Sequence, residues 1–211
     1  MASYEIRLFG DPVLRSPAAE VTNVDGALVK VTETMIQTMY DAPGVGLAAP
    51  QVGIQKRLFV YDLHDGEGAK VLINPVIKES RGEWVFDEGC LSVPGLSWEI
   101  TRPKEIHLVG YDLDGNEIDV EADEYVARVY QHEMDHLEGR LLIDFLEPEA
   151  RADAMRVLRN RILENGTAED PAKLAARAEE RKKRLVIPKG AKEGDPKQGK
   201  NRLGITLPGL K

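Results

Sequence analysis

The segment from about residue 123 to residue 137 constrains the fold more than any other, because it predicts a helix with one buried face. Its first apolar positions have the spacing of that face: Tyr125, Val126, Val129 and Tyr130. The sequence HEMDH at 132–136 then continues the face with polar side chains. Residues four apart lie on one side of a helix, so His132 and His136 can reach one metal ion. A hydrogen-bonded polar cluster is the alternative, since buried imidazoles need a partner or a metal.

Cys90 is the only cysteine of the chain and the best candidate for a third metal ligand. Thiolates bind Zn²⁺ or Fe²⁺ well, and three protein ligands leave a fourth position open, as in catalytic sites. Glu133, beside His132, is placed to take a proton from an activated water. A lone cysteine is more often a small buried hydrophobe, so this assignment depends on the histidine pattern downstream.

Short strands and two further helices are predicted around the central helix. Asp25 is expected to cap a helix ending near Tyr40, and another helix is expected from Pro148 to about Leu163. Strand-like runs occupy 57–62, 70–77, 84–86, 105–111 and about 117–120, with a turn at 113–116 before the last. Because strands and helices do not alternate as in βαβ units, the sequence predicts an α+β domain. Short antiparallel strands would pack around the central helix, with an N-terminal and a C-terminal helix beside them.

Length and composition fit one catalytic domain, residues 1–166, followed by an extension, residues 167–211. Hydrophobic residues make up 42% and charged residues 30%, which is typical of soluble proteins. No apolar run approaches the roughly 20 residues of a membrane span. The first seven residues lack the layout of a signal peptide, and one cysteine permits no intrachain disulfide. A cytoplasmic protein without membrane contact is therefore expected.

The net charge of −8 is unevenly distributed. Residues 171–211 contain 12 Lys and Arg against 4 Asp and Glu, so they carry +8 and the rest carries −16. A helix is expected over 172–185 and a flexible segment over 188–211. An acidic body with a basic extension indicates that the extension meets a polyanion, whereas a solvated end without a partner is the alternative.

Three segments together resemble the three motifs of the peptide deformylase family, in its bacterial form. They are GVGLAAPQ at 44–51, EGCLS at 88–92 and QHEMDHLEG at 131–139, and the resemblance covers roughly residues 14–163. It implies a metal-dependent hydrolase that removes the formyl group from N-terminal formylmethionine of nascent polypeptides and releases formate. On this resemblance Cys90, His132 and His136 hold the metal, with Fe²⁺ the usual ion and Zn²⁺, Ni²⁺ or Co²⁺ as possible substitutes.

The resemblance also implies catalytic roles for three further groups. Glu133 would take the proton of the water and pass it to the departing amine. The side-chain amide of Gln51 and the backbone N–H of Leu91 would stabilise the developing oxyanion. Glu88 and Arg102 permit an ion pair that steadies the loop of Cys90.

Four residues are candidates for substrate binding by the same resemblance. Val45 and Gly46 would lie alongside the substrate peptide, and Val45, Tyr125 and Val129 would form walls of a methionine pocket. Plain core packing is the alternative for each wall residue. Arg128 occupies a position where the family often has an aliphatic residue, so its stem is expected to line the pocket while its head reaches solvent.

The expected partners are nascent polypeptides that begin with formylmethionine. C-terminal segments of the family are associated with ribosome docking, and a +8 extension is consistent with attraction to RNA. The chain is expected to be a monomer.

Three other interpretations remain open. A zinc endopeptidase shares the HExxH pattern, but such enzymes usually take their third ligand downstream. A deformylase-like binding protein without turnover is disfavoured by the presence of Glu133 and Gln51. A structural metal module is disfavoured because three ligands leave an open position.

Overall fold

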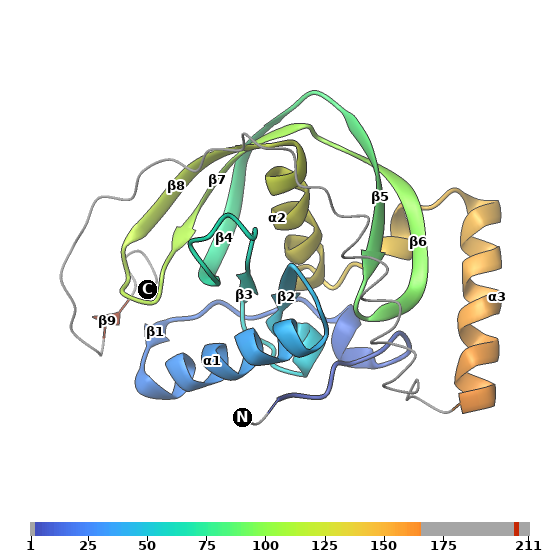
Figure 1. The fold of residues 1–211 in the computed structure, drawn as a ribbon, viewed down its shortest axis with the longest axis horizontal. Helices are drawn as coiled ribbons and strands as arrows, with labels where there is room; N and C mark the ends of the chain where they lie inside the picture. Colours follow the sequence, from blue (N-terminus) through green and yellow to red (C-terminus); the bar gives the residue numbers. More distant parts are fainter. Residues whose placement is uncertain (1–2, 166–204, 207–211) are drawn as a thin grey trace.

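A five-stranded antiparallel sheet lies at the centre of the fold (Figure 1). The structure, a computed structural model, describes residues 3–165 and 205–206. The strand order is β2 (Gly46–Ala48), β3 (Leu58–Tyr61), β4 (Lys70–Arg81), β7 (Glu105–Tyr111) and β8 (Glu117–Asp123). The predicted hairpin turn before β8 is confirmed: the carboxylate of Asp112 accepts the N–H groups of Asp114 and Asn116, and Gly115 has a positive φ of 75°.

Helices α1 (Gly26–Asp41) and α2 (Glu124–Leu137) pack in two separate cores. Alternate positions of the same strands contribute side chains to one core or the other. Phe59, Tyr61 and Leu72 share a core with α2. The neighbouring positions of the same strands share a core with α1: Leu58, Val60, Val71 and Ile73. Because successive side chains of a strand point to opposite faces, each face of the sheet is covered by one helix. As predicted, Asp25 caps α1, its carboxylate accepting the N–H of Leu28.

Strands β5 (Trp84–Cys90) and β6 (Val93–Arg102) form a separate two-stranded sheet, here called the ribbon. In Figure 1, α2 lies between the ribbon and the long strands β4, β7 and β8. The sequence predicted only 84–86 of β5 and no strand over 93–102, and that prediction was wrong. Pro94 and Gly95 are turn formers, and they lie where the register shifts, with Gly95 at a φ of +68°. The pairing of Trp84 with Arg102 through Gly89 with Ser97 holds the rest of the segment extended.

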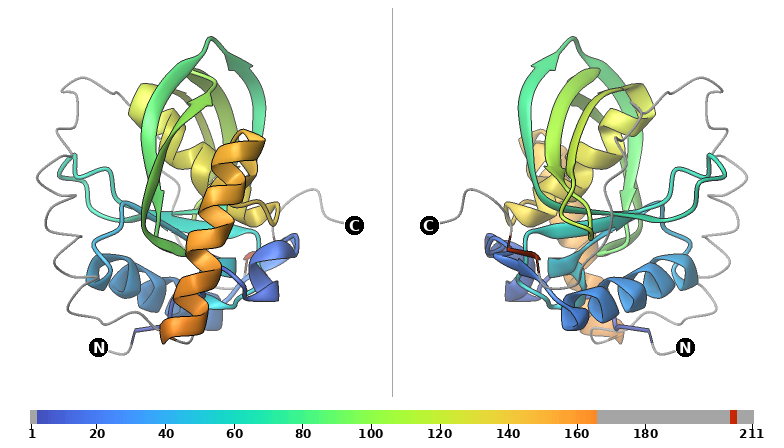
Figure 2. Two further views of the ribbon diagram at one scale, coloured as in Figure 1. Left: turned by 90° about the vertical axis from the view of Figure 1, so that its right-hand side faces the viewer. Right: turned by 90° about the vertical axis from the view of Figure 1, so that its left-hand side faces the viewer.

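Helix α3 (Pro148–Asn165) lies beside the ribbon on the outside of the molecule (Figure 2). Short 3-10 turns, η1 (Pro12–Arg15), η2 (Ala49–Val52) and η3 (Leu142–Phe145), connect the larger elements. A third apolar core joins η1, the ribbon, η3 and α3: Leu14, Cys90, Val93, Ile100, Leu141, Leu142, Ile143, Ala154 and Leu158. The side chain of Cys90 is therefore packed among the apolar side chains of this core.

Strand β1 (Asn23–Val24) pairs antiparallel with β9 (Ile205–Thr206) in a small two-stranded sheet. The boundary predicted at residue 166, the helix expected over 172–185 and most of the segment 188–211 lie outside the described residues. Within residues 3–165 and 205–206, no helix is both long and apolar enough to cross a membrane. The predicted α+β class, with antiparallel strands around a central helix, is confirmed.

Candidate metal centre

Helix α2 presents both histidines of the HExxH pattern to one place. The rings of His132 and His136 lie edge to face, with centroids 5.1 Å apart. The helix ends where predicted, because Gly139 has a φ of +70° and donates its N–H to the carbonyl of His136 at 3.2 Å. The spacing of the pattern on a helix thus brings two imidazoles together.

Cys90 ends strand β5 and completes the cluster. Its Sγ lies 3.2 Å from Nε2 of His136, and the ligand atoms of Cys90, His132 and His136 all lie within 4.8 Å of one another. Burial opposes ionisation of the thiol, but the neighbouring His136 and His132 outweigh it and hold the pKa of Cys90 well below its usual value. The thiolate is the form that binds a metal, so the sulfur is ready for that role.

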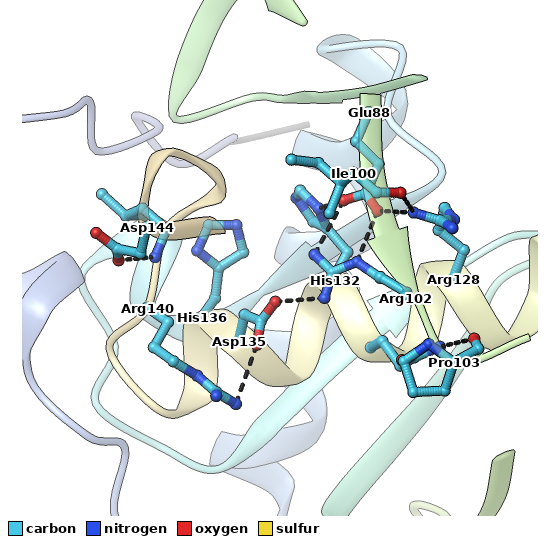
Figure 3. Close-up of polar contacts among 12 residues, drawn as sticks. Glu88, Ile100, Arg102, Pro103, Arg128, His132, Asp135, His136, Arg140 and Asp144 are labelled. Atoms are coloured by element: carbon cyan, nitrogen blue, oxygen red, sulfur yellow. Dashed lines mark hydrogen bonds and ion pairs between the residues drawn. The ribbon is translucent and has the colours of Figure 1, made fainter. Parts of the chain in front are cut away.

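Glu88 orients His132. Its Oε2 lies 2.9 Å from Nδ1 of His132, which leaves Nε2 of the ring for a metal. Metal-binding histidines are commonly oriented by a carboxylate in this way. The predicted ion pair with Arg102 is confirmed at 2.6 and 3.0 Å, and Arg102 also reaches Asp135 at 2.6 Å (Figure 3). Burial alone would raise the pKa of Glu88. Hydrogen bonds from His132 and Arg102 outweigh burial and hold that pKa far below its usual value.

The three side chains fit a metal ion by their chemistry. Although burial favours the neutral ring, Cys90 and Glu88 raise the pKa of His132 to about 10, so a thiolate and an imidazolium face each other. A divalent cation would replace that proton, as binding of metals to His and Cys generally does. Two soft or borderline ligand types suit Fe²⁺ or Zn²⁺ and leave room for water or substrate.

Gln51 points its amide nitrogen at this cluster. The N–H of Ala48 donates to its Oε1 at 2.8 Å, so Nε2 faces Ser92 Oγ at 3.2 Å and Cys90 Sγ at 3.7 Å. One N–H donates to Ser92 and the other to the sulfur of Cys90, so the amide is held against the cluster. Leu91 lies between Cys90 and Ser92 in the turn that joins the ribbon strands. The contact of Ser92 was not predicted, and its only sequence signal was its place at the end of EGCLS.

Glu133 is 4% exposed and packs against strand β2. Its Oε2 lies among the buried atoms that have no hydrogen-bond partner within the described part of the chain. Burial raises the pKa of Glu133, although His132 and His136 oppose the rise. A buried carboxylate with a free oxygen and a raised pKa is suited to accept and return a proton.

The residues predicted to bind substrate lie on α2 or next to it. Tyr125 and Val129 belong to the core between α2 and the sheet, and Val45 packs against that core while half-buried. Gly46 begins β2, directly against Glu133. The expectation for Arg128 was wrong: its side chain is buried and its head does not reach solvent, because Glu88 and two backbone carbonyls hold it inside.

Comparisons with known proteins agree with this geometry. The family model described as polypeptide deformylase matches residues 3–152. A peptide deformylase of Acidothermus cellulolyticus is 49% identical over 159 residues, covering 75% of this chain and 87% of the relative. The crystal structure of peptide deformylase from Thermotoga maritima is 49% identical with a TM-score of 0.67, covering 70% of this chain and all of that one. A peptide deformylase structure from Legionella pneumophila gives 39% identity and a TM-score of 0.72, covering 75% and 95%. The chain therefore belongs to the peptide deformylase family.

Proposed function

We propose that this chain removes the formyl group from N-terminal formylmethionine of nascent polypeptides, releasing formate and a free amino terminus. One observation carries the proposal: in a member of this family, the three ligand atoms of Cys90, His132 and His136 converge within 4.8 Å. Glu133 and the amide of Gln51 adjoin the same cluster, so a base and an oxyanion donor stand beside the ligands.

The chemical roles are proposed from these contacts and, for Leu91, from the resemblance of EGCLS to the family motif. A divalent ion at this centre supplies Lewis acidity and makes water a stronger nucleophile at neutral pH; we propose Fe²⁺, with Zn²⁺, Ni²⁺ or Co²⁺ as substitutes. Glu133 takes the proton of the attacking water at its free carboxylate oxygen and returns it to the departing amine nitrogen. Gln51 Nε2 and the backbone N–H of Leu91 donate to the developing oxyanion.

Strand β2 supports a main-chain mode of substrate binding. It is the end strand of the five-stranded sheet, paired there only with β3 in the described part of the chain. A substrate peptide can add to such an edge through backbone hydrogen bonds, which bind many sequences alike. Val45 and Gly46 then lie beside the peptide, and Val45, Tyr125 and Val129 form the apolar surroundings of the methionine side chain.

The direct test is formate release from formyl-Met-Ala by protein purified anaerobically, with bound metal measured in the same sample. Roughly one metal ion per chain together with formate release is the expected result. Cleavage of an internal peptide bond instead would favour the zinc endopeptidase. Bound metal without formate release, even after exchange to Fe²⁺ or Ni²⁺, would contradict the proposed reaction.

Replacing Gly46 by alanine should lower kcat for formate release by about 10²-fold, because small displacements of catalytic groups are costly. A Cβ added there would lie 2.3 Å from Oε1 of Glu133 and 2.7 Å from its Cδ, so the carboxylate must move. Metal content should stay unchanged. Gly26→Ala is the matched control, since an added Cβ at Gly26 meets nothing within 4 Å. An unchanged kcat in Gly46→Ala would show that the position of Glu133 is not critical.

We also propose that the basic extension attracts the ribosome, and that the protein acts as a monomer in the cytoplasm, where nascent chains emerge. Removing residues 167–211 should weaken co-sedimentation with ribosomes at low salt, because contacts between basic residues and phosphates dominate such binding. Neutralising Arg181, Lys182, Lys183 and Arg184 with glutamine keeps the length and should act in the same direction. Unchanged co-sedimentation of both variants would contradict the ribosome proposal, while formyl-Met-Ala turnover should persist in both.

A further inference from the structure

Arg128 is a buried cation on α2, one turn before His132, and it is 3% exposed. Its Nη1 donates to Oε1 of Glu88 and, at 2.8 Å, to the carbonyl of Ile100, and its Nη2 donates to the carbonyl of Trp84. The guanidinium also lies over the ring of Trp84, 5.0 Å from its centroid. Figure 3 shows the guanidinium of Arg128 facing the carboxylate of Glu88, which Arg102 also reaches.

These contacts join three elements of the fold. Trp84 and Glu88 belong to β5, Ile100 belongs to β6, and Arg128 belongs to α2. Strand β5 ends in the thiol of Cys90, and α2 carries both imidazoles. A single planar guanidinium therefore connects both strands of the ribbon that carries one metal ligand to the helix that carries the other two.

The carboxylate of Glu88 has a complete set of donors only when Arg128 is present. Oε1 accepts from Arg102 Nε and Arg128 Nη1, and Oε2 faces Arg102 Nη2 and His132 Nδ1. A carboxylate offers about four lone-pair positions, so these four partners fix its rotation. The orientation of Glu88 in turn sets that of the His132 ring, which is bonded to it through Nδ1.

Charge leads to the same conclusion. Two buried carboxylates, Glu88 and Asp135, lie beside two buried guanidiniums, Arg102 and Arg128. Arg102 bridges both acids, and Arg128 adds a second buried positive charge at Glu88. The more exposed Arg140 contacts Asp135 from outside. An aliphatic residue at position 128 would remove one of the two buried guanidiniums that face Glu88 and leave the carbonyls of Trp84 and Ile100 without these donors.

We propose that Arg128 is a positioning residue for the metal centre, which fixes Glu88 and His132 and docks the strand of Cys90 against α2 before the ion binds. This inference rests on the proposed function only in assigning a metal ion to Cys90, His132 and His136. It concerns how well the three ligands are held together in metal-free protein, which can be measured without any substrate.

The test compares Co²⁺ binding by metal-free Arg128→Met and Arg140→Met proteins with that of the full-length unaltered chain. Binding is measured through the thiolate-to-cobalt absorption band. We expect Arg128→Met to bind Co²⁺ about 10- to 100-fold more weakly, with an altered band, as when groups that orient ligands are removed. Arg140 is the matched control: it contacts Asp135 at 3.0 Å, but its side chain is 54% exposed. Arg140→Met should stay within about 2-fold of the unaltered chain, because exposed ion pairs contribute little.

Co²⁺ affinity and an absorption band like those of the unaltered chain in Arg128→Met would overturn the proposal. Cooperative urea unfolding establishes that the variant is folded. If it does not fold, Arg128→Lys decides, because one ammonium can pair with Glu88 but cannot span both carbonyls as well. Intermediate affinity in Arg128→Lys supports the proposal, and unaltered affinity overturns it. An unaltered chain that fails to bind Co²⁺ would contradict the metal site itself, which is a separate result.

Discussion

Glu133→Gln is expected to lower kcat for formate release from formyl-Met-Ala by about 10²- to 10⁴-fold, the usual contribution of a general base. Glutamine has the shape of glutamate and fits beside Gly46, but its amide cannot accept the proton of the attacking water. Metal content should be unchanged, because the cluster of ligand atoms is Cys90, His132 and His136. The measurements are steady-state formate release and metal analysis of the same preparation.

The control for this variant is Glu121→Gln on strand β8, where the side chain is exposed and pairs with Arg81. Its turnover should equal that of the unaltered chain. If Glu133→Gln retains full activity, Glu133 does not transfer the proton. If it loses metal together with activity, the residue supports the ion instead of acting on the water.

Cys90→Ala should reduce bound metal from about one ion per chain to almost none and abolish formate release with it. Two imidazoles alone form a much weaker site, since the thiolate supplies the negative ligand whose pKa is already held low. The side chain lies in the core formed with Leu14, Val93 and Ile100, so alanine leaves only a small cavity. Metal analysis, formate release and urea unfolding should be measured on one preparation.

Metal-free unaltered protein is the proper reference for the stability of Cys90→Ala, because both lack the ion. Their unfolding curves should nearly coincide, apart from the small cavity. Since the chain has one cysteine, thiol titration reports directly on residue 90. Retention of metal and turnover by Cys90→Ala would remove the thiolate from the ligand set.

The sequence predicted best those features that depend on neighbours along the chain. Helix α2 follows from the apolar spacing around Tyr125 and Val129, and the turn before β8 follows from its Asp and Gly residues. The three ligands followed from their chemical type and from motif resemblance. Each of these signals is contained within a short window of sequence.

Features created by distant partners could not be read in the same way. Strand β6 begins with an irregularity at Pro94 and Gly95, and its later residues are extended because β5 pairs with them, from Trp84 with Arg102 to Gly89 with Ser97. Arg128 was expected to reach solvent because nothing near it in sequence shows that Glu88 and Ile100 will surround it. Burial of a charged side chain depends on the tertiary arrangement of its partners.

Strand β2 has a consequence for the way the protein meets unfolded chains. It is three residues long, Gly46–Ala48, and all three are buried. A long exposed edge would be a template on which passing polypeptides could aggregate, whereas so short an edge can hold only the first residues of a chain. Turnover should therefore depend little on the more distant residues of the substrate. An emerging polypeptide can dissociate before it folds or aggregates on the enzyme. A short binding edge would suit an enzyme that must bind each new chain once and then release it.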